Sequence, residues 1–410
     1  MKKYWDDSYT FSFESRIIDV TEQEGRLGLV LQDTYFFPEG GGQPSDRGSI
    51  ASRPVVGVEE VGDTVIHFLE YDEEADKRLR KGMIVSCDID KEFRLHNMRI
   101  HSACHVLFGA ARKLFPSVNY AGFHIGELGN LYLETGQQIT ANELRKIELI
   151  ANECVVHDRP IKTFWVTSKD AAHLDRLAYN IELPRDEPVR IVEVEDWDIA
   201  ACSGTHLHRS VEIGPIKIVA RESHRKNVTR IDYAIGKRAI AEFAEDERIV
   251  AETATLLGTS KDQLTQVVRK MASELQSDRK RLRKLRELLV GYKVQELLQS
   301  VEAIGGVQLI IDSVDYLDSK SIQAMVATIV SERESVIAAI IGVDDQLTVV
   351  AGCSQDVNIS LSEPIVRIAE KYGGGGGGRA NLVTAGGIRG SFRAVRDEVE
   401  MELKQTLHRS

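Results

Sequence analysis

The sequence of 410 residues contains no apolar run near the roughly 18–20 residues that a membrane-spanning helix needs. Its start, MKKYWDDSYTF, lacks the apolar core of a signal peptide. Both absences predict a cytoplasmic protein with no membrane partner. Cysteine is scarce and odd in number, without CxxC spacing: Cys87, Cys104, Cys154, Cys202 and Cys353. A disulfide framework is therefore not expected, and reduced thiols would be free to bind a metal.

The sequence also lacks an excess of basic residues. The chain has 63 aspartates and glutamates against 52 lysines and arginines, which gives a net charge of −11. Taken alone, this balance argues against non-specific binding to nucleic acid, because basic side chains are needed to neutralise phosphates. The composition, 42% hydrophobic and 28% charged, is that of a globular protein. The length indicates about two to four domains.

The order of patterns predicts a multidomain α+β protein. Residues 1–91 indicate a small β-barrel-like domain with a glycine-rich loop, FPEGGGQPSDRG, and residues 92–236 an α+β domain. Residues 237–300 contain no proline and repeat apolar residues near heptad spacing, which predicts a helical hairpin or an intermolecular coiled-coil arm. Residues 301–410 alternate strand and helix patterns around a glycine run, which predicts a separate α/β domain.

Local signals predict individual elements within these domains. The expected helices are Lys91–Leu114, Thr140–Asp158 with Thr140 and Glu143 as a capping box, Ser319–Glu332 and Pro364–Tyr372. The expected strands are Arg16–Val20, Arg26–Leu31, Thr64–Leu69, Met83–Ile89, Ile161–Val166, Pro188–Val194, Ile216–Ala220, Val307–Ile311, Val336–Gly342 and Leu347–Ala351.

Two pairs of residues have the spacing of metal ligands. His101 and His105 lie four residues apart on an expected helix, so their imidazoles project from one face. Cys202 and His206 repeat that offset in ACSGTHL, and a soft thiolate favours zinc over magnesium or calcium. Either pair alone would more often be ordinary residues, but both together predict a bound Zn²⁺. Ser102 stands where a metalloprotease would carry its glutamate base, which argues against peptide hydrolysis.

Three motifs together resemble a known family. RLHNMRIHSACH, CSGTHL and FPEGGGQPSDRG look like the editing domain of alanyl-tRNA synthetase and its freestanding AlaX relatives, and GGGGGGRANLVTAGG is similar to the synthetase's glycine-rich C-terminal domain. The resemblance covers essentially the whole chain in the order of the long AlaX form. It implies a zinc-dependent deacylase that hydrolyses the ester of serine or glycine on tRNA(Ala). Only about 90 residues precede the metal helix, too few for an aminoacylation core, so action in trans is expected.

The glycine-rich loop is the expected substrate contact. Gly41 and Gly42 let the backbone approach a ligand closely, and Gln43 offers a donor and an acceptor to a serine hydroxyl or a terminal ribose. A plain hairpin turn is the alternative reading of this cluster. In YAGFHIG, Gly122 and His124 are expected to line the pocket with Phe123, although His124 could equally be a surface or packing histidine.

Basic residues cluster locally despite the acidic total. Arg225 and Lys226 follow the last expected strand of the metal domain, and Arg283 and Lys284 belong to a basic stretch of the helical arm. Both clusters predict contact with tRNA, the alternative being a solvated helix face. Gly375, Gly376 and Arg379 come from a glycine run that is neither a P-loop nor a dinucleotide fingerprint, and an anion nest for a tRNA phosphate is expected there rather than a flexible linker. A homodimer through the arm or the C-terminal domain is also expected.

The role of the zinc stays open between several readings. Four ligands would close a tetrahedron, whereas a catalytic zinc usually keeps one position free. A zinc that holds the substrate, with His101, His105 and Cys202 as firm ligands and His206 as the weakest, is the preferred interpretation. One rival function is a tRNA-binding protein with a structural zinc and no turnover. Another is a phosphoesterase, which would need clustered Asp and His ligands that the sequence does not show.

Overall fold

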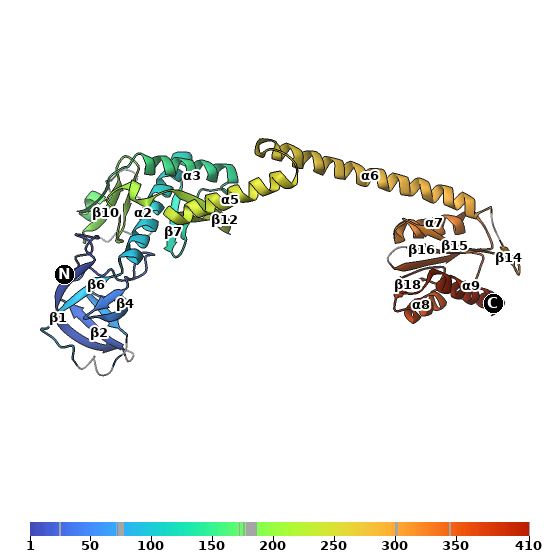
Figure 1. Cartoon of the computed structure of the whole chain (residues 1–410), viewed down its shortest axis with the longest axis horizontal. Helices are drawn as coiled ribbons and strands as arrows, with labels where there is room; N and C mark the ends of the chain where they lie inside the picture. The colour runs from blue at the N-terminus through green and yellow to red at the C-terminus, as the bar shows by residue number, and fades with distance from the viewer. Residues whose placement is uncertain are drawn as a thin grey trace. The chain divides into compact units, whose positions relative to one another are not determined.

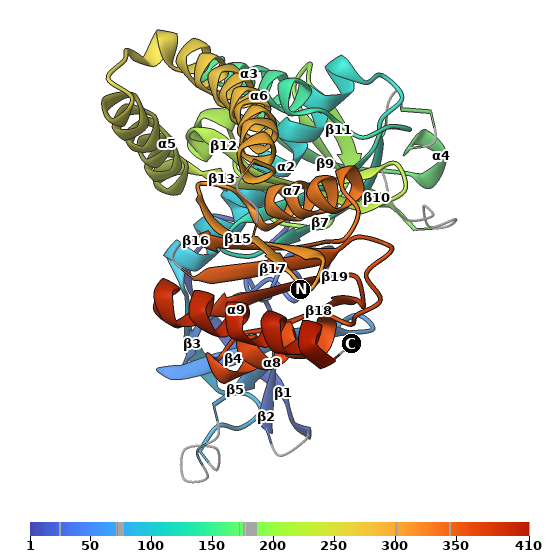
Figure 2. The same cartoon turned by 90° about the vertical axis from the view of Figure 1, so that its right-hand side faces the viewer.

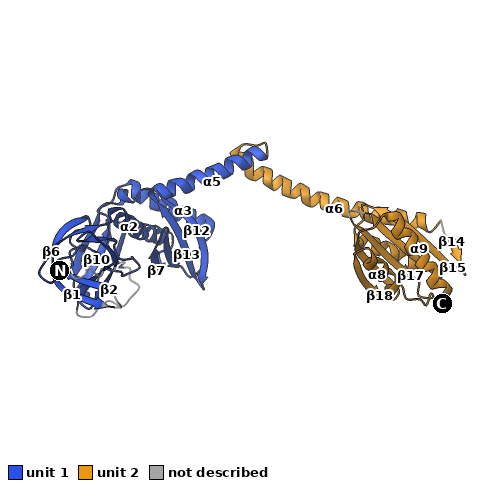
Figure 3. Cartoon of the chain, turned by 60° about the horizontal axis from the view of Figure 1, so that its bottom comes forward, with its two compact units in different colours: residues 1–256 blue, residues 257–410 orange. Residues whose placement is uncertain are grey.

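The computed structural model describes residues 1–23, 26–70, 72, 78–171, 173–174, 177, 187–299, 302–343 and 346–409. The chain forms two compact units, Met1–Leu256 and Leu257–Ser410 (Figure 3). The boundary predicted between residues 300 and 301 lies outside the described residues. Within the described ranges, no helix combines the length and the apolar composition needed to cross a membrane.

The first unit begins with a closed six-stranded antiparallel barrel in the order β1-β2-β5-β4-β3-β6 (Figure 1). Its strands are β1 (Ser12–Gln23), β2 (Arg26–Leu31), β3 (Gly48–Ile50), β4 (Arg53–Val61), β5 (Thr64–Leu69) and β6 (Ile84–Ile89). Ile17, Leu29 and Val58 are fully buried inside it, because alternate side chains of a strand face the interior. The prediction of a barrel-like N-terminal domain is confirmed.

The helix α2 (Lys91–Leu114) follows the barrel and has the bounds predicted from the sequence. Asp90 caps its N-terminus by accepting a hydrogen bond from the amide of Phe93 at 3.1 Å. Every residue from Ile100 to Ala111 is buried, so the helix runs through the interior of the unit. His101 and His105 are therefore held away from bulk water.

Two antiparallel sheets contact α2, in the orders β12-β13-β8-β7 and β11-β10-β9. Their strands are β7 (Asn119–Ile125), β8 (Gly129–Glu134), β9 (Ile161–Val166), β10 (Val189–Val194), β11 (Asp198–Ala201), β12 (Ile216–Arg225) and β13 (Val228–Ile235). The accompanying helices are α3 (Ala141–Val156), α4 (Ser168–Ala171), η1 (Ser210–Ile213) and α5 (Gly236–Leu256). The predicted capping box of Thr140 and Glu143 starts α3.

Six strands of the first unit were not predicted, and two are longer than predicted. The missing strands are β3, β4, β7, β8, β11 and β13, while β1 spans Ser12–Gln23 instead of Arg16–Val20 and β12 continues beyond Ala220 to Arg225. The outer half of β12, RESHR, is exposed, so it carries no apolar alternation that could reveal a strand. Arg225 and Lys226 consequently lie at the tip of the β12–β13 hairpin, and not after the last strand as predicted.

The second unit contains a six-stranded sheet in the order β14-β15-β16-β17-β19-β18. Its strands are β14 (Glu302–Ile304), β15 (Val307–Asp315), β16 (Val336–Val343), β17 (Leu347–Cys353), β18 (Gly375–Arg379) and β19 (Leu382–Ile388). Its helices are η2 (Lys261–Gln263), α6 (Leu264–Leu297), α7 (Ser319–Glu332), α8 (Ser362–Lys371) and α9 (Phe392–Arg409). Helix α7 covers one face of the sheet, while α8 and α9 cover the other (Figure 2). The predicted C-terminal α/β architecture is confirmed.

The glycine run does not form the loop that an anion nest requires. Gly375–Arg379 is a strand that pairs antiparallel with β19, and it is the last strand of the sheet in the order given above. A Cβ atom on Gly376 would lie 2.5 Å from the carbonyl oxygen of Thr384, and one on Gly378 would lie 2.3 Å from that of Leu382. The glycines are needed because the two backbones approach so closely.

Candidate metal centre

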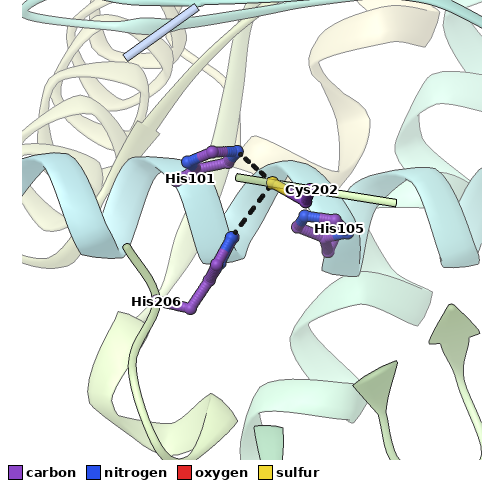
Figure 4. Close-up of side chains that lie close together, drawn as sticks. All are labelled: His101, His105, Cys202 and His206. Atoms are coloured by element: carbon purple, nitrogen blue, oxygen red, sulfur yellow. Dashed lines mark hydrogen bonds between the residues drawn. The ribbon is translucent and has the colours of Figure 1, made fainter. Parts of the chain in front are cut away.

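The structure brings together the four side chains that the sequence predicted as zinc ligands. His101 and His105 project from α2, Cys202 follows β11, and His206 lies four residues further along the same loop. One ligand atom from each residue can be chosen so that all four lie within 4.8 Å of one another (Figure 4). Two stretches about 100 residues apart thus meet at one buried point.

Cys202 and two of the histidines have donor atoms at the separation found between ligands of a tetrahedral zinc ion. The Sγ of Cys202 lies 3.3 Å from the Nε2 of His101 and 3.3 Å from the Nε2 of His206. Two ligand atoms on one tetrahedral zinc lie about 3.3–3.7 Å apart, as its bond lengths dictate. His206, which the sequence ranked as the weakest ligand, is as close to the thiolate as His101. The residues therefore fit zinc.

Each histidine is oriented through its other ring nitrogen. The Nδ1 of His101 lies 3.0 Å from the Oε1 of Gln43, and the Nδ1 of His105 lies 3.0 Å from the Oδ2 of Asp198. The Nδ1 of His206 lies 3.3 Å from the Oγ of Ser102. Partners of this kind fix the tautomer and the direction of a ligating imidazole, and they leave each Nε2 available to a metal.

The electrostatics favour a thiolate at Cys202. Burial alone would raise the pKa of this thiol, but the neighbouring His101 and His206 outweigh burial and hold it well below its usual value. Burial disfavours the charged form of two rings, because it lowers the pKa of His101 and holds that of His206 well below its usual value. His105 differs, because its bonds to Asp198 and Cys202 overcome the effect of burial and raise its pKa to about 9. Zinc is ligated by a thiolate and neutral imidazoles, so His105 has to release a proton when the metal binds.

The glycine-rich loop lies beside this cluster, but Gln43 faces the protein interior. The residue is only 1% exposed. Its Nε2 donates to the Oγ1 of Thr205 at 2.8 Å, and its Oε1 accepts from the amide of Thr205 at 3.1 Å. Gln43 therefore joins the loop of His206 to the ring of His101, and its amide is already engaged where a substrate contact was predicted.

Gly41 and Gly42 occupy positions that suit only glycine. Their φ angles are +58° and +81°. A Cβ atom on Gly42 would lie 2.8 Å from the carbonyl oxygen of Phe123, and one on Gly41 would lie 3.1 Å from the Oγ of Ser203. The glycine-rich loop therefore packs closely against β7 on one side and against the loop that follows β11 on the other.

On β7, Phe123 rather than His124 faces the cluster. The ring of Phe123 lies 4.4 Å from that of His101, between centroids. His124 is exposed and its position alternates with that of Phe123 along the strand, so it points the other way. Gly122 has a φ of +129° at a register shift between β7 and β8. Phe123 is therefore the residue of YAGFHIG that the structure brings to the site.

The residues predicted to contact tRNA lie on three separate elements and are exposed in each. Arg225 and Lys226 are at the tip of the β12–β13 hairpin, and Arg283 and Lys284 are on α6. Gly375, Gly376 and Arg379 are in the edge strand β18. A hollow between β18 and α8 is lined partly by Glu363 and Glu370.

Several residues around the cluster escaped sequence analysis. Asp198 is 4% exposed and contacts His105, and Arg190 is 7% exposed and donates to the carbonyl oxygens of Cys202 and Gly204, at 2.9 Å each. Gly204 also belongs here, because a Cβ atom on it would lie 2.2 Å from the ring of His101. A charged residue inside an apolar strand, as in VRIVEV, is the one signal that could have indicated Arg190.

No other metal-ligand group appears in the parts of the chain that the structure describes. In particular, the clustered aspartates and histidines of a DHH-type phosphoesterase are absent from those parts. Within the described residues, the cluster of His101, His105, Cys202 and His206 is therefore the candidate metal centre.

Comparison with known proteins matches two domain families. Residues 189–232 match the threonyl and alanyl tRNA synthetase second additional domain, and residues 306–405 match the DHHA1 domain. The first match contains Arg190, Asp198, Cys202 and His206. The second covers most of the second unit.

Whole-sequence relatives are named alanine–tRNA ligase. The enzyme of Methanopyrus kandleri is 31% identical over 94% of this chain and 42% of its own length, and that of Pyrococcus furiosus is 33% identical over 75% of this chain and 34% of its own length. The chain thus spans about two-fifths or less of these curated relatives. The C-Ala domain of Aquifex aeolicus alanyl-tRNA synthetase matches 26% of this chain and 97% of its own at 22% identity, with a TM-score of 0.24. The chain is an AlaX-like relative of the alanine–tRNA ligases, with the second additional domain of threonyl and alanyl tRNA synthetases and a DHHA1 domain.

Proposed function

We propose that this chain is a zinc-dependent aminoacyl-tRNA deacylase that hydrolyses the ester of serine or glycine on tRNA(Ala). The single observation that supports the proposal best is the convergence of one thiolate and three oriented imidazoles beside a glycine-rich loop. The relatives' name and the second additional domain supply the link to alanine tRNA.

His101, His105, Cys202 and His206 would hold the metal. When bound there, zinc supplies a Lewis acid that can orient the substrate and stabilise charge on the ester oxygen. Gln43, Asp198 and Ser102 keep the three rings aimed at the metal, so the ligands need not rearrange during turnover. The ring of Phe123 lies against that of His101, and the backbone of Gly41 and Gly42 packs closely beside it, so this side of the metal site is formed by Phe123 and the glycine-rich loop.

Rejection of alanine requires a polar contact to the serine hydroxyl. An apolar pocket gains little from one extra methyl or hydroxyl group, whereas a site built to hydrogen-bond that hydroxyl discriminates strongly against a substrate that lacks it. The amide oxygen and nitrogen of Gln43 both bond to Thr205, and the oxygen also bonds to His101, so the proposal assigns Gln43 to holding the site together and not to reading the hydroxyl.

The remaining tRNA would contact exposed basic residues. We assign this role to Arg225 and Lys226 on the β12–β13 hairpin and to Arg283 and Lys284 on α6. Arg379 and the outer edge of β18 at Gly375 and Gly376 are the proposed contact of the second unit. Because these contacts would be to phosphates, raising the salt concentration should weaken tRNA binding.

A second copy of the chain is the proposed partner of α6. Exposed apolar residues follow this helix at spacings of three and four, with one step of seven across Asp278, namely Val268, Met271, Leu275, Leu282, Leu285 and Leu289. Such a heptad pattern is typical of the seam of a two-stranded coiled coil. Arg283 and Lys284 lie beside the seam and would stay accessible to RNA in a dimer.

The function is tested by adding the purified chain to tRNA(Ala) charged with serine, glycine or alanine by another enzyme. We expect release of serine, glycine or both, with the alanyl ester spared. Cys202→Ala should abolish release while the far-UV circular dichroism spectrum is kept, and Cys87→Ala, in the barrel, is the matched control. Binding of tRNA without any release of amino acid would instead support a tRNA-binding protein with a structural zinc.

A further inference from the structure

The loop that carries Cys202 and His206 is held largely by side chains from elsewhere in the chain. Arg190 donates to the carbonyl oxygens of Cys202 and Gly204, and the amide of Leu207 donates to the Oγ of Ser102 at 3.2 Å. Two more anchors come from the far N-terminus. Both precede the barrel and belong to neither ligand motif.

The first anchor is Trp5 and the second is Ser8. The Nε1 of Trp5 donates to the carbonyl oxygen of Ser203 at 2.7 Å, and the Oγ of Ser8 donates to that of His206 at 3.0 Å. These bonds join residues 198 positions apart in the sequence. They hold the backbone of Ser203, which directly follows Cys202, and the backbone of the ligand His206.

The same segment is also fixed to the helix of the other two ligands. The carbonyl oxygen of Ser8 accepts a hydrogen bond from the Nη1 of Arg94 at 3.0 Å, and Arg94 lies on α2, two turns before His101. Tyr4 is 1% exposed and its ring lies 5.4 Å from that of Phe37, which ties the segment to the barrel. The N-terminal segment therefore bridges the helix of His101 and the loop of His206.

We infer that Trp5 and Ser8 are positioning residues of the metal centre, which set the distance between the two ligand pairs. The inference rests on the proposed zinc site. A loop left without these anchors would sample positions in which the Sγ of Cys202 and the Nε2 of His206 no longer lie 3.3 Å apart and close to His101. Zinc would then have to order the loop when it binds, which lowers its affinity.

A purely structural role would leave a different signature. If Trp5 and Ser8 only stabilised the barrel, their substitution would lower the melting temperature of the metal-free chain and leave zinc affinity unchanged. A positioning role predicts weaker zinc affinity with little change in the metal-free melting temperature. The two readouts separate the alternatives.

The test measures the zinc dissociation constant of the full chain by competition with a chromophoric chelator, together with the metal-free melting temperature. Trp5→Phe keeps the ring and removes the donor, and Ser8→Ala removes the hydroxyl. We expect each to weaken zinc binding roughly 3- to 10-fold, the value of one hydrogen bond, and the double variant to weaken it roughly 10- to 100-fold.

Two matched controls lie nearby without touching the loop. Trp165→Phe changes the ring that packs 5.2 Å from Trp5, and Ser12→Ala removes a hydroxyl that donates to Asp88. Both should keep the wild-type affinity. The inference is overturned if wild type binds zinc and the double variant binds it equally well, or if its affinity falls no more than that of the controls. Wild-type protein that binds no zinc would overturn the proposed metal site itself and this inference with it.

Discussion

Among the partners that orient the three histidines, only Asp198 carries a charge. Gln43 offers an amide to His101 and Ser102 a hydroxyl to His206, whereas Asp198 offers a carboxylate to His105. A zinc ion with one thiolate retains a net positive charge in a buried site. The carboxylate of Asp198 offsets part of that charge through the ring of His105, which makes this imidazole the strongest donor of the three.

The variant Asp198→Asn tests this role, because it replaces one carboxylate oxygen by an amide nitrogen. The amide keeps the shape of the side chain but removes its charge, so we expect zinc affinity to fall roughly 10- to 100-fold. Chelator competition measures the change. Asp196→Asn is the control, because Asp196 lies two residues away with a side chain that is 87% exposed. Equal zinc affinity in the two variants would show that Asp198 does not act on the metal.

The sequence predicted the ligands but not the residues around them. His101, His105, Cys202 and His206 could be predicted because zinc requires particular donor types and because each pair keeps a local spacing. Asp198, Arg190 and Trp5 have no such local pattern, since their contacts depend on how distant segments pack. The two readings of His124 stayed open for the same reason: no strand was predicted for YAGFHIG, and only the alternation of a strand separates His124 from Phe123.

At the scale of elements, α2 is anchored to the barrel by a buried ion pair. Arg94 on α2 and Asp46 in the loop between β2 and β3 are both essentially inaccessible to solvent. The Nε of Arg94 donates to the Oδ1 of Asp46 at 2.8 Å, and a second bond joins its Nη2 to Oδ2. This pair holds the loop of Gly41 and Gly42 against the helix that carries His101.

Asp46→Asn should destabilise the first unit strongly. The substitution leaves the buried charge of Arg94 without a counter-charge, which costs about 3–5 kcal/mol of unfolding free energy. Urea denaturation gives the value. Glu195→Gln, which breaks the exposed pair with Lys162, should cost far less, because water screens an exposed ion pair. A loss at Asp46 no larger than at Glu195 would contradict the anchoring role.

Helices with caps and periodic apolar residues could be predicted from sequence, and the glycine-rich edge strand could not. Helix α2 and helix α7 (Ser319–Glu332) have the predicted bounds, because their caps and periodic apolar residues are local signals. The run Gly373–Gly378 has no side chains to alternate, so nothing in it could reveal the edge strand β18. Gly375–Arg379 forms a strand because its backbone pairs with that of β19.

At the scale of the whole molecule, each unit has its own hydrophobic core. The first unit is built around clusters in the barrel and around α2, and the second around both faces of its sheet. Much of α6 contributes to neither core, since its seam of apolar residues is 44–61% exposed. An exposed stripe of this length is costly in water unless another surface covers it.

The proposed dimer can be tested by light scattering coupled to size-exclusion chromatography. Wild type should elute with twice the mass of the chain, because pairing buries the seam of α6. Leu275→Glu with Leu285→Glu places charges in that seam and should give a monomer. Lys280→Glu, on the opposite side of the helix, changes charge without entering the seam and should remain a dimer. Retention of the dimer in the double leucine variant would exclude α6 as the interface.

The bonds from Trp5 and Ser8 to the loop of His206 also constrain how the protein is made. A ribosome that adds about 5–20 residues per second needs roughly 10–40 s to travel from Trp5 to the metal loop. During that interval the indole and the hydroxyl have emerged but their acceptors have not been synthesised. The metal site can therefore form only after His206 has been synthesised, well after the N-terminal segment that anchors its loop.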